Sequence, residues 1–589
     1  MANYRNPLLL LPYLCLMIPL NIYVAGSQVG AVMQWALFRN QQLPGADVTL
    51  VAFTRDLSLV LAGTLAGRSA LGVLVWFSAI CLFTGSFVIT LIGLVVRNRK
   101  NAKAAALLCI VSGLLFLLSD VIRYGLTLQG PSGFCVPVGI PLLLVSGWWA
   151  YRSDPFPETV PGPVATVPSG NPVRIFSITL PEIDRGTLKN DLLILVLISL
   201  IVKMLVLSSA LTTLLSILPG DMTLYYWYAH SILLGKIPYI SFNAEYPQLF
   251  FVPVVLAILP FMGNPDFTSY LFSFGAITIA FDIATLVCVY VLAARFFGQE
   301  KAFLSGLLYT TAISVAFFIP IVYDIIPTFF LVFSLCCFIY GKDVTAYVSA
   351  AVGVLLKWFP FAGFPFFYLS TKKNGRELNG FRTGVIVTIL LFAACSLPFI
   401  LIDAGKFFRT YMFHILRPAE AHSFIYYMDA VSLFLINLQP VSKISFLLFI
   451  LAECVLLYWY YRHLDGTALT LTYALFLSVF AFVLFNKVLA TYYIIWLTPF
   501  LALLLARSAK HILLFYLVQI IMFLETPVLL RIVYTPYKDY FVIENSTLSV
   551  SFVFYTVKFA IFFILLYVIV RDVRRLQDPG GRTHIQTES

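Results

Sequence analysis

Charged residues are scarce in this chain. Only 11% of its 589 residues are Asp, Glu, Lys or Arg, whereas 61% are hydrophobic. Soluble domains carry about a quarter charged residues, and no soluble fold of this length could bury so much apolar sequence. The composition therefore excludes a soluble protein and predicts an integral membrane protein with many spans.

Metal-binding and disulfide patterns are also lacking. Most of the nine cysteines lie inside apolar blocks, and no Cys-x-x-Cys or Cys/His ligand spacing occurs. We interpret them as small apolar core residues. The first apolar block, 8–24, lacks a convincing signal-peptide cleavage site, so we predict that it is an uncleaved first span.

The net charge of +11 does not indicate a nucleic-acid partner, because the basic residues are spread over short loops between apolar blocks. These loops lie at 97–103, 295–301, 372–376, 507–510 and 571–575. An excess of Lys and Arg marks cytoplasmic loops in membrane proteins. We therefore predict that these loops and both termini are cytoplasmic, and that the charge reports topology.

Long apolar blocks dominate the rest of the sequence. Those at 192–218, 269–294, 383–402, 444–461 and 551–570 each approach the roughly 20 residues that a spanning helix needs. Such spans must be helical, because lipid offers no partner to backbone polar groups. The predicted fold class is an all-α, polytopic transmembrane helical bundle with roughly sixteen spans.

The sequence divides into four parts. Residues 1–152 are predicted to form an N-terminal four-span transmembrane unit, with spans at 8–24, 70–96, 104–128 and 134–151. Residues 153–189 are a Pro-rich cytoplasmic linker, 190–572 a second transmembrane domain, and 573–589 a cytoplasmic tail. Parity of the loops predicts that the block 249–262 does not cross the bilayer completely, since it has 14 residues and a proline near each end.

A few charged residues lie inside or beside apolar blocks. Asp120 and Arg123 are three residues apart, so we expect them to pair on one helix face. Asp282, Glu453 and Glu525 have no such neighbour in sequence. A charge in a span costs roughly 2.5–3.5 kcal/mol on insertion scales, which makes each of them a candidate for function or for a partner inside the protein.

Polar residues concentrate in the predicted outside loops of the second domain. Asp221 follows the first span of that domain, at the level of lipid head groups. Three cations, Lys357, Arg417 and Lys487, lie outside against the usual bias. Beside polar motifs, they suggest an anionic ligand such as a phosphate at the outer leaflet. The aromatic run Tyr225–Tyr228 suits either an interfacial belt or sugar stacking.

These residues, in their order, resemble the polyprenyl-phosphate-sugar-dependent glycosyltransferases of the GT-C fold, closest to glycosyltransferase family 87, which is mannosyltransferase-like. The resemblance covers about residues 190–510 and excludes the N-terminal unit. Gln248 replaces the second proline of a Tyr-Pro-Pro motif, Val322 replaces a glutamine, and Trp358 separates a lysine from its proline. The matching stretches are Asp221 with Tyr225, Leu233–Tyr239, Glu245–Gln248, Tyr323–Pro327, Lys357–Pro360, Arg417–Ser423 and Lys487–Pro499.

The resemblance implies an enzyme that moves a hexose, expected to be mannose, from a polyprenyl-phosphate donor to a lipid or glycan acceptor on the non-cytoplasmic face. It implies inversion at the sugar, with Asp221 as the general base and Asp324 orienting the acceptor or assisting the base. Lys487, Arg417 and Lys357 would hold the donor phosphate. The remaining candidate substrate-binding residues are Tyr225, Glu245, Tyr246, His414, His422, Tyr492 and Trp496.

Neither a cofactor nor a metal site is firmly implied. A divalent metal at Asp221, Asp324 or Glu245 is left open, although no ligand spacing demands one. The expected location is the plasma membrane of a prokaryote or the endoplasmic reticulum of a eukaryote.

Two alternatives to this function stay open. A polytopic transporter or lipid flippase would also have many spans, but paired broken helices near the bilayer midplane would then be expected. The motifs here collect at one face, which favours an interfacial enzyme. Within enzymes, the alternative is another GT-C branch with a protein or lipid acceptor.

Overall fold

The computed structural model describes residues 5–25, 31–42, 49–130, 133–156, 173–175, 178–180, 185–217, 219–261, 266–420, 422–435, 444–525 and 550–577. Most of the predicted Pro-rich linker and of the C-terminal tail lies outside the described residues. The chain forms two compact units. The first comprises Met1–Val173 and Ile183–Ile217, and the second comprises Arg174–Glu182 and Leu218–Ser589.

Helices account for most of the described chain. Seven of the described helices are long and apolar enough to cross a membrane: α2 (Gly67–Val96), α3 (Arg99–Tyr124), α8 (Phe267–Phe297), α14 (Asn379–Leu416), α16 (Ser445–His463), α17 (Ala468–Phe485) and α21 (Val550–Gln577). Several further apolar helices have 10–17 residues. The prediction of a helical multi-pass membrane protein is therefore confirmed in this coarse form.

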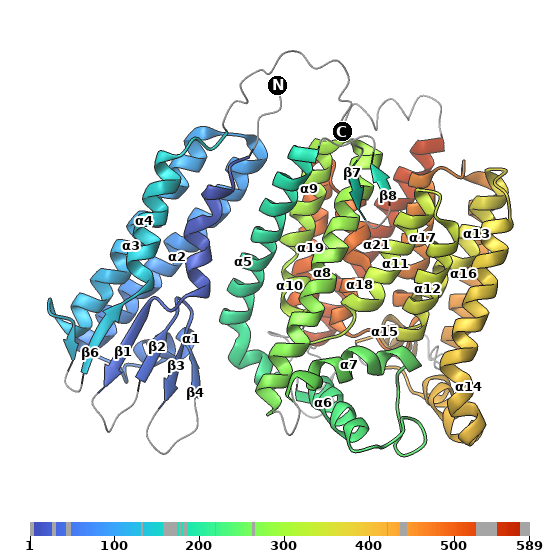
Figure 1. Ribbon diagram of the computed structural model, residues 1–589, viewed down its shortest axis with the longest axis horizontal. Helices are drawn as coiled ribbons and strands as arrows, with labels where there is room; N and C mark the ends of the chain where they lie inside the picture. The colour runs from blue at the N-terminus through green and yellow to red at the C-terminus, as the bar shows by residue number, and fades with distance from the viewer. Residues whose placement is uncertain are drawn as a thin grey trace, which may run out of the picture. The chain divides into compact units, whose positions relative to one another are not determined.

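The first unit adds a small sheet, which was not predicted, to the mainly helical fold. Besides α2, α3 and α4 (Gly139–Arg152) it contains η1 (Pro7–Met17), α1 (Phe53–Leu61), α5 (Arg185–Ile217) and a six-stranded sheet in the order β4-β3-β2-β1-β6-β5. Figure 1 shows these strands at one end of α2, α3 and α4. The strands are β1 (Asn21–Ala25), β2 (Ala31–Gln34), β3 (Phe38–Gln42), β4 (Thr49–Ala52), β5 (Gln129–Gly130) and β6 (Gly133–Pro137).

Two predicted spans of this unit are wrong in their bounds for the same reason. The block 8–24 is a 3-10 helix that ends at Met17 and continues as β1, and the block 134–151 begins as β6 before α4 starts. Asn6 caps the 3-10 helix by accepting a hydrogen bond from the Leu8 amide at 3.0 Å. Hydrophobicity predicts burial but does not separate a short strand from the end of a span.

Helix α5, predicted to open the second domain, packs with the first unit. The guanidinium of Arg5 lies 3.0 Å from the carboxylate of Asp191, and both side chains are buried. The Asn190 amide donates to the Arg5 carbonyl at 2.8 Å. The boundary between the compact units therefore falls after Ile217 and not at residue 190.

The second unit is a bundle of helices with short connections, preceded in the chain by β7 (Val173–Ile175) and β8 (Ile178–Leu180). Figure 1 shows α6, α7 and α15 across the lower end of its upright helices. In addition to α8, α14, α16, α17 and α21, its helices are α6 (Pro219–Leu233), η2 (Gln248–Phe250), α7 (Phe251–Ile258), η3 (Leu259–Phe261), α9 (Gln299–Thr310), α10 (Ile313–Phe318), α11 (Ile325–Ile339), α12 (Asp343–Leu356), η4 (Phe359–Ala362), α13 (Gly363–Lys373), α15 (Phe424–Leu435), η6 (Thr491–Tyr493), α18 (Ile494–Leu504) and α19 (Ala509–Leu524).

The predicted non-crossing block corresponds to the continuous stretch η2–α7–η3. At 1.5 Å per residue its 14 residues span about 21 Å, short of the roughly 30 Å of a hydrocarbon core. Figure 1 shows α7 lying across the upright helices of the unit.

Several of the predicted cytoplasmic loops meet at the opposite end of the second unit. The Lys301 ammonium donates to the Arg507 carbonyl at 3.3 Å, and the Arg507 guanidinium lies 3.3 Å from the Asp572 carboxylate. Lys373 donates to the Tyr461 carbonyl at 2.9 Å. The loops that charge assigned to one side of the membrane thus share one end of the fold.

Candidate active site

Asp221 lies in the first turn of α6 and is half-buried. The hydroxyl of Tyr492, from η6, donates a hydrogen bond of 3.0 Å to its Oδ2 atom. The two residues are 271 positions apart, so the contact depends on the tertiary fold. A carboxylate offers about four acceptor positions, and this hydrogen bond uses one of them.

Asp324 lies immediately before α11 and is fully buried. Its Oδ1 atom accepts two hydrogen bonds, from the Lys357 ammonium at 2.6 Å and from the Trp496 indole N–H at 2.7 Å. Its Oδ2 atom has no hydrogen-bond partner among the described residues. Asp324 and Lys357 therefore form a buried ion pair, which joins two of the predicted motifs.

The Lys357 ammonium is also surrounded by aromatic rings. It lies 4.9 Å from the ring centroid of Tyr323, 5.6 Å from Tyr492, 4.8 Å from Tyr493 and 4.9 Å from Trp496. Such rings stabilise a cation through their quadrupoles. Because Tyr492 also binds Asp221, a single side chain links the Lys357 environment to the second carboxylate.

Burial and charge act in opposite directions on the carboxyl groups. Burial raises the pKa of Asp324, the ammonium of Lys357 opposes this, and the charge of Asp221 raises the pKa further. Burial likewise raises the pKa of Glu245, against the effect of Arg417. Asp221 thus acts electrostatically on both of the other acidic groups in this part of the unit.

An aromatic wall adjoins these groups. Tyr225, on α6, is fully buried and contacts the rings of Tyr246, Phe250 and Tyr323 at centroid distances of 5.8, 5.2 and 5.8 Å. Tyr246 in turn stacks on Phe250 at 4.0 Å. Full burial places Tyr225 in the core of the unit, and it argues against a role in an exposed interfacial belt.

Arg417 and Lys487, the other predicted phosphate ligands, lie on two loops that contact each other. The Glu420 amide donates to the Lys487 carbonyl at 2.8 Å, and the Lys487 ammonium donates to the Ile415 carbonyl at 3.2 Å. Arg417 forms an ion pair with Glu420. His414 bonds the Glu245 carbonyl through Nε2 at 2.8 Å, which ties the end of α14 to the motif loop after α6.

His422 belongs to a different cluster. Its Nδ1 atom lies 3.2 Å from the Glu525 carboxylate and 3.0 Å from the Tyr555 hydroxyl. The Lys558 ammonium lies 2.7 Å from the same carboxylate, and Glu525 and Lys558 are both buried. The sequence singled out Glu525, but it did not indicate its partner.

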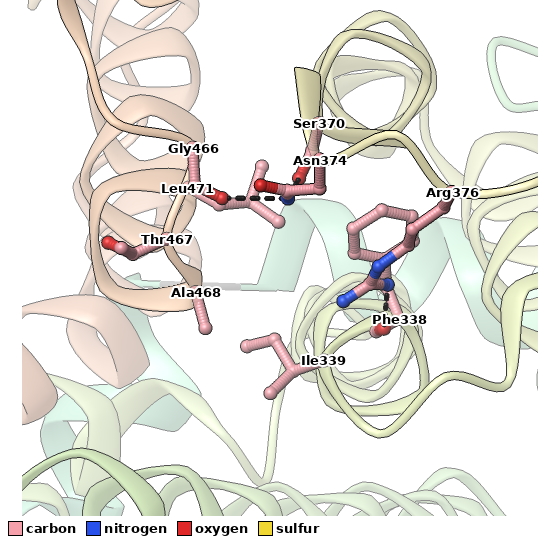
Figure 2. A pocket seen from close by; sticks show the side chains of 9 residues that line it. All are labelled: Phe338, Ile339, Ser370, Asn374, Arg376, Gly466, Thr467, Ala468 and Leu471. Carbon is pink, nitrogen blue, oxygen red and sulfur yellow. Dashed lines mark hydrogen bonds between the residues drawn. The ribbon is translucent and has the colours of Figure 1, made fainter. Parts of the chain in front are cut away.

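The two described cavities do not contain the candidate catalytic residues. The larger one, about 320 Å³, lies between the ends of α11, α13 and α17. Figure 2 shows Arg376 and Asn374 at its rim, with the guanidinium bonded to the Phe338 carbonyl at 3.3 Å and the amide to the Gly466 carbonyl at 3.0 Å. The described residues also contain no group of three or more His, Cys, Asp or Glu side chains that could hold a metal ion.

No protein-family model matches the chain, and a comparison with curated proteins gives no match either.

Proposed function

We propose that the second unit is a membrane glycosyltransferase that moves a hexose from a polyprenyl-phosphate donor to a lipid or glycan acceptor. The expected hexose is mannose. The observation that supports this is the continuous path Asp221–Tyr492–Lys357–Asp324. Residues that resemble family motifs in four separate stretches of sequence contact one another in the fold. A resemblance that arose by chance would not be expected to bring these four residues into contact.

The two carboxylates differ in their surroundings, and this difference supports different proposed roles. Asp324 is buried and neutralised by Lys357, so its proposed role is to position Trp496 and the lysine. Asp221 is half-buried and bears no ion pair among the described contacts, so it is the proposed general base. In the reaction, the acceptor hydroxyl gives its proton to Asp221 and its oxygen bonds to the anomeric carbon. The bond from that carbon to the donor phosphate oxygen breaks, the phosphate takes the electron pair, and the configuration inverts.

The cations differ in the burial of their partners. Lys357 pairs with Asp324, which is 0% exposed, whereas Arg417 pairs with Glu420, which is 35% exposed and closer to solvent. Arg417 and Lys487 lie on two loops that contact each other, and both residues are half-buried. They are the proposed ligands of the donor phosphate, where cations stabilise the charge that develops on the leaving group.

The test is transfer by the purified protein in liposomes, with polyprenyl-phosphate mannose as donor and octyl mannoside as acceptor. Asp221→Asn should lower turnover about 10²- to 10⁴-fold with little change in donor binding, because it removes the base and keeps the size of the side chain. Asp403→Asn is the matched control, since Asp403 is 38% exposed and pairs with Lys406.

Near-normal turnover by Asp221→Asn would remove Asp221 from the mechanism. Movement of a solute by the wild-type protein without any sugar transfer would contradict the proposed enzymatic function and would indicate a transporter.

A further inference from the structure

The first unit contains a polar cavity of about 160 Å³ between the sheet and the C-terminal end of α3. Its lining includes Asn21 and Tyr23 from β1, Gln34 from β2, Arg39 from β3, and Arg123 and Tyr124 from α3. One water needs only about 10–15 Å³ of such space. The cavity is therefore large enough for a molecule of several heavy atoms.

The sheet register explains why the lining is polar. Asn21 is paired with Gln34 across β1 and β2, and Gln34 is paired with Arg39 across β2 and β3. Directly opposed residues of neighbouring antiparallel strands lie on the same face. Three polar side chains thus form a row on the face that lines the cavity, at a position where a core would hold apolar ones.

Several polar atoms of the lining have no hydrogen-bond partner among the described residues. They are the Oδ1 atom of Asn21, the Nε atom of Arg39, and the Nε and Nη2 atoms of Arg123. Asn21 is only 2% exposed, and its amide nitrogen donates to Asp120 at 2.8 Å, which fixes its oxygen as the free acceptor. Buried groups of this kind are normally satisfied by protein, water or a ligand.

The expected pair of Asp120 and Arg123 is absent from the described ion pairs, since Asp120 binds Asn21 instead. Arg123 is held beside α2, where a Cβ at Gly72 would lie 2.5 Å from its Cγ atom. The glycine therefore gives the arginine the room that it occupies. Arg123 is placed by this packing and by the Trp76 ring, whose centroid lies 5.8 Å from the guanidinium carbon, and its Nε and Nη2 atoms have no hydrogen-bond partner among the described residues.

Each arginine of the lining has a carboxyl group nearby. Arg39 forms an ion pair with Asp56, and Arg123 lies close enough to Asp120 to act on it electrostatically. A simple anion would be repelled by these carboxyl groups. Unpartnered donors and an unpartnered acceptor together match a hydroxyl group, which both accepts and donates.

Two stacked tyrosines, together with Val32 and Cys135, make up the rest of the lining. The rings of Tyr23 and Tyr124 lie 5.2 Å apart at 27°, and they offer apolar contact beside the polar groups. We propose that this cavity binds an uncharged, hydroxyl-rich ligand, namely a saccharide unit. The proposal concerns the first unit and does not depend on the glycosyltransferase activity proposed for the second.

The experiment uses the full chain in a detergent without a sugar head group. Saturation-transfer NMR measures binding of methyl α-mannoside and methyl β-glucoside, with inorganic phosphate as a second probe. Arg123→Gln and Gln34→Ala should each weaken binding of one or both glycosides about tenfold or more, as expected for loss of hydrogen bonds in a buried site. Arg68→Gln, at an exposed position at the start of α2, should leave it unchanged.

Gln34→Ala decides the question if Arg123→Gln does not fold. Wild-type affinity in both variants would place the glycoside elsewhere and overturn the proposal, as would the absence of glycoside binding to the wild type. Binding of phosphate without binding of either glycoside would also overturn it and would indicate an anion site. Asp221→Asn should still bind the glycosides, whereas Arg123→Gln should not. Glycoside binding by the first unit can therefore be distinguished from a failure of the transfer activity proposed for the second unit.

Discussion

Replacing Lys357 by methionine tests the buried ion pair most directly. Methionine keeps the length and the apolar contact with the surrounding rings but removes the charge. The lysine side chain is 16% exposed and that of Asp324 is 0% exposed. The variant leaves Asp324 with the Trp496 hydrogen bond alone among its described partners, and with an uncompensated charge in the interior.

The expected loss of stability follows from that geometry. Removing one partner of a buried ion pair costs about 3–5 kcal/mol. Because Lys357 keeps some contact with solvent, we expect the lower end, about 3 kcal/mol, or a change of about 150-fold in the unfolding equilibrium. The double variant Lys357→Met/Asp324→Asn should recover about 1–3 kcal/mol relative to the sum of the single variants.

The loss should depend on pH. Burial already raises the pKa of Asp324, and Lys357 opposes that effect, so the variant raises this pKa further above the value of the unfolded chain, about 3.9. A raised pKa means that the folded state binds the proton more tightly, so the variant loses stability as pH rises through the folded-state pKa. Its deficit relative to wild type should be smaller at about pH 5 than at about pH 8.

Equilibrium unfolding by SDS in mixed micelles, followed by circular dichroism, measures these differences. Lys487→Met is the control, because that lysine donates to a backbone carbonyl and has no carboxylate partner among the described contacts. Equal stability of Lys357→Met and wild type, or a double variant as unstable as the sum, would refute the reasoning.

Three further predictions concern packing, assembly and topology. A Cβ at Gly384 would lie 2.7 Å from the Tyr347 Cβ, so Gly384→Leu should cost about 1–3 kcal/mol; an unchanged unfolding midpoint would show that α12 and α14 can separate without loss. Arg5→Leu removes the guanidinium that lies 3.0 Å from the buried Asp191 carboxylate and should make the first unit more sensitive to limited proteolysis, whereas unchanged cleavage would contradict the importance of the pair. A cysteine introduced at position 221 should react with an impermeant maleimide from the non-cytoplasmic side, and labelling from the cytoplasm alone would reverse the topology.

Hydropathy and charge predicted the features that bulk composition controls. They identified a helical multi-pass protein and grouped the basic loops, several of which meet in the structure. The short block that becomes η2–α7–η3 was recognised because its length and prolines are local properties. Residues at the ends of helices, such as Asp221 and Lys357, could be chosen because polar groups beside apolar spans are rare.

The pairings could not be predicted, because they join residues far apart in the chain. Lys357 was expected to hold a phosphate. In the structure it forms an ion pair with Asp324, and this pairing depends on the tertiary fold. His422 was placed with the substrate, but it contacts Glu525. The sheet of the first unit was missed because its short strands lie in apolar or mixed sequence without clear alternation, so periodicity gave no signal.

The Glu525–Lys558 pair has a consequence for how the chain is assembled. Its two members lie on either side of the segment 526–549, at the end of α19 and within α21, the last helix among the described residues. Before α21 packs in place, the Glu525 carboxylate lacks the Lys558 cation. Until the pair forms, Lys558 is a charged residue within an apolar helix and lacks its carboxylate partner. The pair therefore favours one register in which α21 can pack stably against the rest of the unit. A chain truncated before this helix should be recognised as incomplete and degraded.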